Sequence, residues 1–167
     1  EGIGLDAFRT PPDDLGLSLD DLSQAYAELI GARRVIATAS GTTALITALH
    51  ALGVDAGDEV IVSPFTFIAT AEVISLVGAT PVFVDIEEQT YNLDPAGLET
   101  AVEAILAGDS QKHPLPSGDS APLRLTPKGI IGVDLFGLPA DYDRINAVAG
   151  RHIAVGTVVV HGVAGAP

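Results

Sequence analysis

Residues 40–45 read Ser-Gly-Thr-Thr-Ala-Leu, and this stretch decides how the whole chain is interpreted. It follows a short apolar run at 35–38 and opens an apolar segment that continues to Leu52. That order predicts a strand, a tight turn of small residues and the start of a helix. The first backbone N–H groups of such a helix have no partners within it and lie at its positive end. The stretch therefore predicts a place for a phosphate group.

Apolar stretches alternate with turn and capping residues along the rest of the chain. Glycines end several helical patterns, and Asp94 before Pro95 is typical of a helix start. We expect helices at about 20–30, 42–52, 67–77, 95–107 and 141–151. We expect strands at about 35–38, 59–63, 81–85, 129–134 and 153–160.

Strands that alternate with helices predict an α/β fold with a mostly parallel sheet and helices on both faces. The continuous apolar strands fit a sheet that is buried on both sides. In such sheets ligands collect at the carboxyl ends of the strands. Four features fall on that edge: the stretch at 40–42, the turn at 63–67, Asp85, and the segment at 134–137.

Two segments fall outside this alternation. Residues 1–17 contain two prolines and several glycines, and we expect an irregular N-terminal arm there. Residues 108–127 are rich in Gly, Pro, Ser and Asp, which predicts a surface loop or insertion. Residues 18–167 are then interpreted as one domain.

Composition excludes several classes of partner and site. The 167 residues carry a formal charge of −14, which disfavours nucleic acids and anionic membranes as partners. No apolar run approaches the roughly 20 residues that a bilayer-spanning helix needs. The chain has no Cys, so disulfides and thiolate metal sites are excluded. We expect a soluble cytoplasmic protein; the chain does not begin with Met, so it is interpreted as trimmed or partial.

Three segments read in order carry a family resemblance. They are SGTTALITALHALGVDAGDEVIVSPFTFIATAEVISLVGATPVFVDI, which begins at Ser40, then YNLDPAGLE and GIIGVDLFGLPADYDRI. Over roughly residues 20–152 the chain resembles the DegT/DnrJ/StrS family of pyridoxal-phosphate-dependent sugar aminotransferases. The resemblance implies an incomplete aspartate-aminotransferase-like large domain, with the C-terminal small domain absent. It also implies pyridoxal phosphate as cofactor and a homodimer with sites at the subunit interface.

The same resemblance implies the reaction. An amino group would move from glutamate, through the cofactor, to a ketone on a nucleotide-linked sugar, in surface polysaccharide or amino-sugar biosynthesis. By position in the family's motifs, Gly41, Thr42 and Thr43 would bind the cofactor phosphate, and Phe67 would stack on its pyridine ring. A flat apolar side chain suits a flat aromatic cofactor. The alternative without the family is an ordinary helix start and a core phenylalanine.

Other polar residues are interpreted as structural. Asp85 and Asp134 follow strands, where turn capping or loop anchoring is expected. Asp141 and Asp143 stand at a helix start, where negative charge is favourable. The histidines show no metal-ligand spacing, and we expect no metal site; they are His50, His113, His152 and His161.

No residue of the chain is assigned as catalytic. The family's carboxylate for the pyridine nitrogen should fall near Val158 or Val159, and no acidic residue follows Asp143. The only lysines are Lys112, which stands in a loop, and Lys128, which stands at the start of a strand and so at the wrong edge for the expected ligand site. A truncated or frameshifted gene, a piece of a longer protein and a non-catalytic paralogue all explain this pattern.

Three further hypotheses stay open. The chain is a non-catalytic partner of a complete aminotransferase, or a related enzyme such as a sugar dehydratase in which another residue replaces the lysine. The third is a nucleotide-binding α/β domain unrelated to pyridoxal phosphate. That domain would need a GxGxxG or GxxxxGK[ST] loop, and the sequence contains neither.

Overall fold

The computed structural model describes residues 18–117, 126–153 and 157–160, the last by its backbone. The expected arm at 1–17 and most of the expected loop at 118–125 lie outside the described residues. The chain separates into two compact units, Glu1–Ser40 and Gly41–Pro167, and each is described by itself. The boundary predicted at 17/18 stays a prediction.

Helix α2 (Leu19–Ile30) is the regular element among the described residues of the first unit. Ser18 caps it, since its hydroxyl accepts the N–H of Asp21 while the Asp21 carboxylate accepts the N–H of Ser18. Hydrogen bonds from Ser18 lower the pKa of Asp21. Gly31 ends the helix with a left-handed φ of 67°, a conformation that glycine adopts without strain. The helix predicted at 20–30 is therefore confirmed.

The strand predicted at 35–38 is wrong. These residues have no helix or strand, and Ile36 is 76% exposed. An apolar run becomes a strand only where a neighbouring strand takes up its backbone N–H and C=O groups. Among the described residues no strand pairs with 35–38. The run therefore has the apolar sequence of a strand but no neighbouring strand to pair with.

The described part of the second unit contains the sheet and four α-helices, and its predicted elements are confirmed with end shifts of a few residues. The strands are β1 (Glu59–Val62), β2 (Thr80–Phe83), β3 (Pro127–Val133) and β4 (Thr157–Val160). The helices are α3 (Gly41–Ala51), α4 (Ala69–Leu76), α5 (Pro95–Ala107), α6 (Tyr142–His152) and the short 3₁₀ turn η2 (Leu135–Gly137).

The sheet has the order β2-β1-β3-β4, and every pair of neighbouring strands is parallel. Ile61 of β1 pairs with Val82 on one side and Ile130 on the other. Each consecutive pair of strands is joined by a helix, so all four strands point the same way. The loops after β1, β2 and β3 consequently leave the sheet at one edge, which we call the carboxyl edge.

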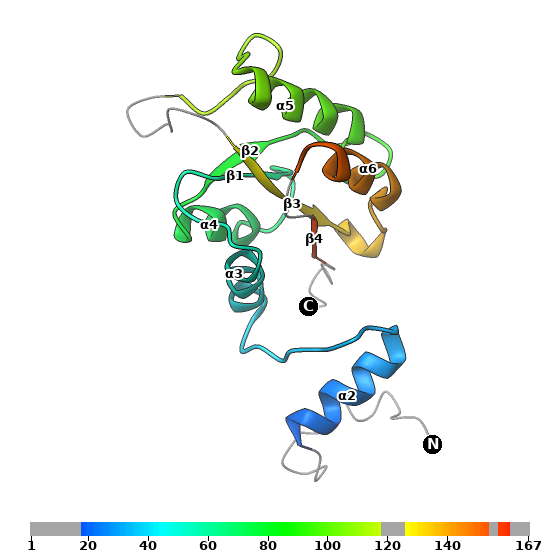
Figure 1. Cartoon of the computed structure of the whole chain (residues 1–167). Helices are drawn as coiled ribbons and strands as arrows, with labels where there is room; N and C mark the ends of the chain where they lie inside the picture. The colour runs from blue at the N-terminus through cyan, green and yellow to red at the C-terminus, as the bar shows by residue number, and fades with distance from the viewer. Residues whose placement is uncertain (1–17, 118–125, 154–156, 161–167) are drawn as a thin grey trace. The chain divides into compact units, whose positions relative to one another are not determined.

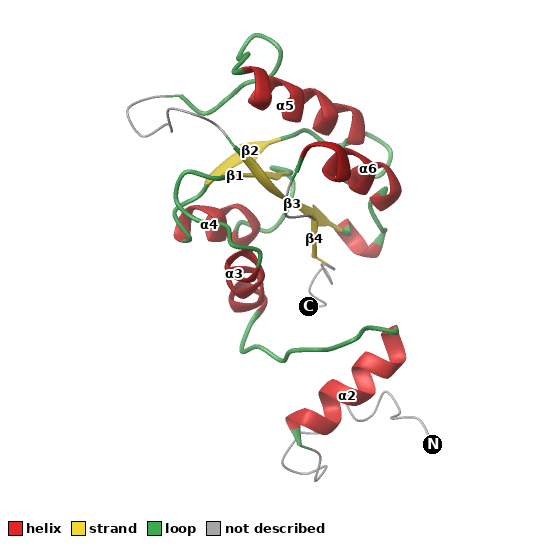
Figure 2. Ribbon diagram, in the orientation of Figure 1, coloured by secondary structure: helices red, strands yellow, loops and turns green. Residues whose placement is uncertain are grey.

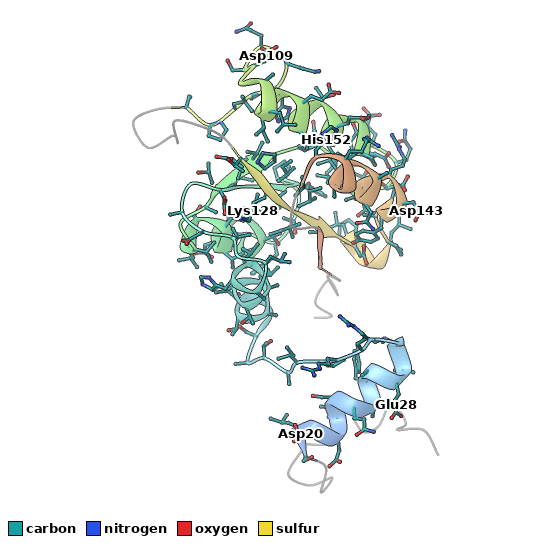
Figure 3. The ribbon with its side chains drawn as sticks, viewed as in Figure 1. Asp20, Glu28, Asp109, Lys128, Asp143 and His152 are labelled. Atoms are coloured by element: carbon teal, nitrogen blue, oxygen red, sulfur yellow. The ribbon has the colours of Figure 1, made fainter. Side chains whose placement is uncertain are left out.

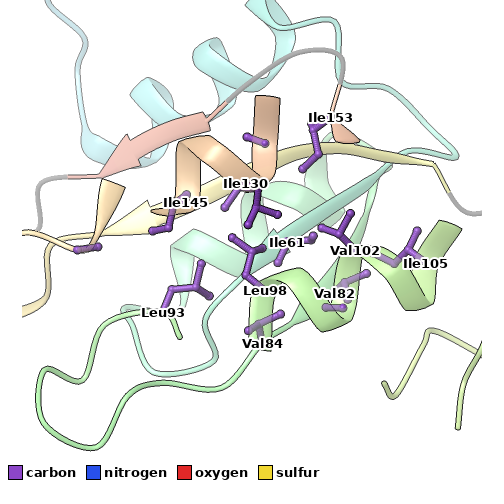
Figure 4. Packing of buried hydrophobic residues seen from close by; sticks show 14 residues of the cluster. Ile61, Val82, Val84, Leu93, Leu98, Val102, Ile105, Ile130, Ile145 and Ile153 are labelled. Carbon is purple, nitrogen blue, oxygen red and sulfur yellow. The ribbon is translucent and has the colours of Figure 1, made fainter. Parts of the chain in front are cut away.

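Helices cover both faces of this sheet (Figure 1). Helices α5 and α6 pack on one face around Ile61, Leu98 and Ile130, and Figure 4 shows this cluster closely. Helices α3 and α4 pack on the other face with Leu49, Ile74 and the remaining sheet residues. Each fully buried Leu or Ile contributes roughly 1.5–3 kcal/mol to folding. The predicted fold class, α/β with a parallel sheet covered on both faces, is confirmed.

The described part of the predicted loop lies beside the edge strand β2. Residues 108–117 contain no helix or strand, as the composition predicts. The Nε2 atom of His113 lies 3.0 Å from the carbonyl oxygen of Phe83, at the end of β2. Lys112 forms an ion pair with Glu103 on α5, which lowers the pKa of Glu103. These contacts hold the loop against β2 and α5.

Glu59 is a buried carboxyl group at the start of β1, on the edge opposite to the carboxyl edge. Its Oε2 accepts the N–H of Thr126, while Oε1 has no hydrogen-bond partner among the described residues. Burial raises the pKa of Glu59 from 4.5 to about 7, and the nearby charge of Asp58 adds to this. The folded state therefore holds the proton of Glu59 more tightly than the unfolded chain does.

This proton makes the free energy of unfolding fall as the pH rises from about 4.5 through about 7, since the unfolded state then binds fewer protons. Glu59→Gln removes the titration and keeps an oxygen for Thr126. Between pH 5 and pH 8 the free energy of unfolding of the wild type should fall by roughly 1–3 kcal/mol relative to that of the variant. Urea unfolding at both pH values measures this; the exposed Glu88→Gln is the control. Parallel pH curves for wild type and Glu59→Gln would contradict the expectation.

Candidate functional site

The predicted site residues belong to segments that start or end at the carboxyl edge. Helix α4 follows β1, so it begins where β1 ends. Helix α3 precedes β1 and returns the chain to the start of that strand, so its first turn faces the same edge. Helices α3 and α4 pack against each other in one core cluster. Figure 2 shows the connecting loops of this edge in green.

Gly41, Thr42 and Thr43 form the first turn of α3, as predicted. Thr42 is half-buried and Thr43 is exposed, and the first turn contains no acidic side chain. Its backbone N–H groups and two hydroxyls are the donors that an anion requires at a helix start. A Cβ atom added at Gly41 would meet nothing within 4 Å, so there is open space beside this turn. The donor set fits a phosphate group.

Phe67 lies directly before α4, in the turn that follows β1. Its side chain is 76% exposed, so the alternative of a core phenylalanine is wrong. The preceding turn is ordered by Ser63, a buried residue whose hydroxyl accepts the N–H of Phe65 at 3.1 Å. Thr66 and Thr70 place their hydroxyls 3.2 Å apart across the start of α4. A ring held on such a turn has a free face for a flat ligand.

Asp134 anchors the loop after β3, as the sequence predicts. It is buried, and its Oδ1 accepts the N–H of Ala140 at 3.1 Å and the hydroxyl of Tyr142. Burial and the hydrogen bond to Asp134 raise the pKa of Tyr142, so the phenol stays protonated and donates. Asp134 is therefore occupied in holding the loop to the start of α6. Asp141 caps α6 by accepting the N–H of Arg144, also as predicted.

Asp85 turns the chain after β2. Its Oδ1 accepts the N–H of Ile86 at 2.8 Å, and its backbone carbonyl accepts the N–H of Asp94 at 3.0 Å. The predicted turn-capping role is confirmed by these contacts.

Asn92 is a site-edge residue that the sequence analysis missed. It is buried, its Oδ1 accepts the N–H of Leu135 at 3.1 Å, and its Nδ2 donates to the carbonyl of Leu138 at 2.9 Å. One side chain thus joins the loop after β2 to the loop after β3. The available signal was a polar Asn between Tyr91 and Leu93 at the end of a turn, and its partners lie more than 40 positions away. Only the folded chain reveals the contact.

Both lysines form ion pairs, and Lys128 lies at the edge opposite to the carboxyl edge. Lys128, labelled in Figure 3, stands near the start of β3 and forms an ion pair with Asp58 at 3.7 Å. Lys112 is paired with Glu103 in the loop after α5. The chain has no further lysine. The donor set at α3 and the ring of Phe67 fit the phosphate and the ring of pyridoxal phosphate, whereas these two lysines do not fit its aldehyde.

Metal binding has no support in the described part of the chain. No group of three or more His, Asp or Glu side chains there has the arrangement of a metal site. His113 contacts a backbone carbonyl, and His161 lies outside the described residues.

Solved structures identify the class of protein to which this fold belongs. A DegT DnrJ EryC1 StrS aminotransferase from Brucella abortus superposes with a TM-score of 0.68 at 38% sequence identity. The match covers 93% of this chain and 38% of that one. NtdA from Bacillus subtilis, solved with bound cofactor PMP, matches with a TM-score of 0.63 at 32% identity, over 80% of this chain and 26% of that one. The fold of this chain is part of the fold of these aminotransferases.

Sequence comparison then gives the family. The DegT/DnrJ/EryC1/StrS aminotransferase family matches residues 13–164. A UDP-2-acetamido-2-deoxy-3-oxo-D-glucuronate aminotransferase from Pseudomonas aeruginosa is 42% identical over 140 residues, which are 83% of this chain and 33% of that protein. The chain belongs to the DegT/DnrJ/EryC1/StrS aminotransferase family, and it spans about a third of the length of this relative.

These comparisons confirm the predicted family and the predicted cofactor, because this is a family of pyridoxal-phosphate-dependent aminotransferases. They do not test the roles of Gly41, Thr42, Thr43 and Phe67, which remain predictions. Within the described ranges, no helix combines the length and apolar character that crossing a membrane requires.

Packing beside Asp134 yields a direct test of the loop anchor. A Cβ atom at Gly132 of β3 would lie 2.9 Å from Cε1 of Tyr142, whereas one at Gly150 of α6 would meet nothing within 4 Å. Gly132→Ala should therefore lower the free energy of unfolding by about 1–3 kcal/mol, because Tyr142 must move away from Asp134. Gly150→Ala should raise it by roughly 0.5–1 kcal/mol, since it lies inside a helix. Urea unfolding of both variants measures these changes. An unchanged free energy of unfolding in Gly132→Ala would contradict the predicted clash with Tyr142.

Proposed function

We propose that this chain is the cofactor-phosphate-binding part of an aminotransferase that acts on a nucleotide-linked keto-sugar. Glutamate is the proposed amino donor, and surface polysaccharide or amino-sugar biosynthesis is the proposed setting. The observation that carries the proposal is the first turn of α3, which supplies backbone donors and threonine hydroxyls, contains no acidic side chain and has open space beside Gly41. The named relative from Pseudomonas aeruginosa acts on a UDP-linked keto-sugar, which supports the substrate class.

In this proposal each site residue of the chain has a binding role. The first-turn amides of α3 and the hydroxyls of Thr42 and Thr43 hold the phosphate, and the helix dipole favours its charge. Phe67 covers one face of the pyridine ring, and its exposed side chain is available for this contact. When bound, pyridoxal phosphate supplies the electron sink for moving the amino group. The chain itself contributes position and orientation.

We further propose that residues 18–167 form a partial large domain, that the complete protein is a homodimer, and that it works in the cytoplasm. The family membership supports these proposals, and the first is also supported by the coverage of about a third of a relative.

The phosphate site is tested with pyridoxamine phosphate, which has no aldehyde to react with lysines, and with pyridoxamine, which lacks the phosphate. Thr42→Val removes one hydroxyl donor to a charged group and should weaken binding of pyridoxamine phosphate by about tenfold. Binding of pyridoxamine should not change. Calorimetric titration of the full chain measures both constants.

The matched control is Thr47→Val, an exposed threonine further along the same helix. It should leave both constants at their wild-type values. Equal affinities of the wild type for pyridoxamine phosphate and pyridoxamine would refute the phosphate site.

The second candidate function is a non-catalytic partner of a complete aminotransferase. The observation that favours it is that Lys112 and Lys128 form ion pairs with Glu103 and Asp58. On either view this chain binds pyridoxal phosphate without a covalent bond.

Borohydride treatment of the chain with one equivalent of pyridoxal phosphate should therefore leave no pyridoxyl group on a lysine, because both amines form ion pairs and Lys128 lies at the opposite edge. Peptide mass spectrometry is the measurement. A stoichiometric adduct at Lys112 or Lys128 would contradict both candidate functions as stated here.

A further inference from the structure

Three aromatic side chains meet at the carboxyl edge, each from a different loop. Phe65 follows β1, Tyr91 follows β2, and Phe136 follows β3. The ring centroids of Phe65 and Tyr91 are 5.8 Å apart at a tilt of 37°, and those of Tyr91 and Phe136 are 6.5 Å apart with the rings nearly perpendicular. We call these three residues the aromatic edge.

The aromatic edge remains open although its rings touch. Phe65 and Tyr91 are each 47% exposed, and Phe136 is 68% exposed. The apolar core is built elsewhere, on the two faces of the sheet, and includes none of the three. Exposed rings of this kind keep surface in contact with water, which suits the stacking of a further flat ring.

Backbone strain accompanies two of these rings. Tyr91 and Phe136 are the non-glycine residues with positive φ in the described part of the chain, at 59° and 54°. A bulky residue in this conformation costs of order 1–3 kcal/mol and persists where its surroundings hold it. The surroundings are known here: the buried Asn92 bonds to the backbone on both sides of Phe136, and it directly follows Tyr91. The fold thus maintains a costly placement of two exposed rings.

Charge narrows the choice of ligand. Glu87 and Asp141, which flank the loops of the aromatic edge in the sequence, each lie 4.0 Å from Arg144. These two carboxylates outnumber the single guanidinium, so the charges beside the aromatic edge do not favour the binding of an anionic group. A ligand that enters here is recognised through an uncharged flat part. The heterocyclic base of a nucleotide is such a part, and every base presents a π-face to an aromatic side chain.

We propose that the aromatic edge stacks the base of the nucleotide-linked sugar. This rests on the proposed function, in which a nucleotide-linked sugar meets the cofactor held by α3 and Phe67 at the same edge. Phe65, Tyr91 and Phe136 supply the stacking surface, and Asn92 is a positioning residue that holds two of the loops together. The base is held by stacking, while the sugar extends along the carboxyl edge toward the cofactor.

The test uses the full chain and three probes: UDP, uridine and ribose 5-phosphate. Saturation-transfer NMR identifies the ligand protons near the protein, and calorimetry measures the affinities. We expect UDP and uridine to bind, with saturation strongest on the protons of the uracil ring, and ribose 5-phosphate to bind at least tenfold more weakly than UDP. Phe136→Leu and Phe65→Leu should each lower the affinity for UDP by about tenfold, which is the effect of losing one base–aromatic contact. Phe136→Tyr keeps a ring and should retain the affinity.

Two controls separate this proposal from a general loss of structure and from the proposed function. Leu106→Ala changes a side chain that is 55% exposed at the end of α5, on the opposite edge of the sheet, and should leave UDP binding unchanged. Phe67→Leu should weaken the binding of pyridoxamine phosphate and leave the binding of UDP unchanged. Phe136→Leu should weaken the binding of UDP and leave that of pyridoxamine phosphate unchanged. Far-ultraviolet circular dichroism verifies that each variant is folded.

Several results would overturn the proposal. They are absence of UDP binding by the wild type, equal affinities for UDP and ribose 5-phosphate, and UDP affinities that neither ring deletion changes. Self-association that disappears in Phe136→Leu, with UDP affinity intact, would instead make the aromatic edge an interface between copies of the chain. Binding of pyridoxamine phosphate tests the cofactor site separately, so UDP binding without cofactor binding would refute the proposed function and leave the aromatic edge standing.

Discussion

Parallel pairing of β1 with β2 on one side and β3 on the other is the constraint on which the rest of this domain depends. The register through Ile61, Val82 and Ile130 makes the three strands run the same way. Every connection must then cross a face of the sheet as a helix. The helices supply the two buried clusters, and the loops after the strands are forced to one edge. Phe65, Tyr91 and Phe136 meet for this reason, although they are far apart in the sequence.

Polar contacts then order the loops that meet at this edge. A loop that leaves a strand end still has many conformations, and ordering it costs roughly 1–2 kcal/mol per residue. Asp134 and Asn92 offset this cost with hydrogen bonds to backbone groups of the loop after β3. Both side chains are buried, so each lost bond would leave a desolvated polar group. The same contacts hold Phe136 in a conformation that an isolated loop would avoid.

The two edges of the sheet differ in chemistry. The exposed rings and the first turn of α3 lie at the carboxyl edge. At the opposite edge, Glu59 is buried with a raised pKa, and Lys128 is paired with Asp58. The carboxyl edge therefore carries the features that bind ligands, whereas the opposite edge carries charges that the fold accommodates. Lys128 consequently lies at the edge opposite to the proposed cofactor site.

The sequence by itself determined the order of the elements, the helix caps and the family. Asp94 with Pro95, Asp141 and Gly31 act within a few residues of themselves, and such contacts leave a local pattern. The apolar run at 35–38 shows where this reasoning stops, because a strand also needs a partner that no local pattern supplies. The bonds of Asn92 to the loop after β3, the burial of Glu59 and the meeting of three rings join distant segments. Only the tertiary structure decided them, since a side chain's neighbours across the fold leave no periodic trace in the sequence.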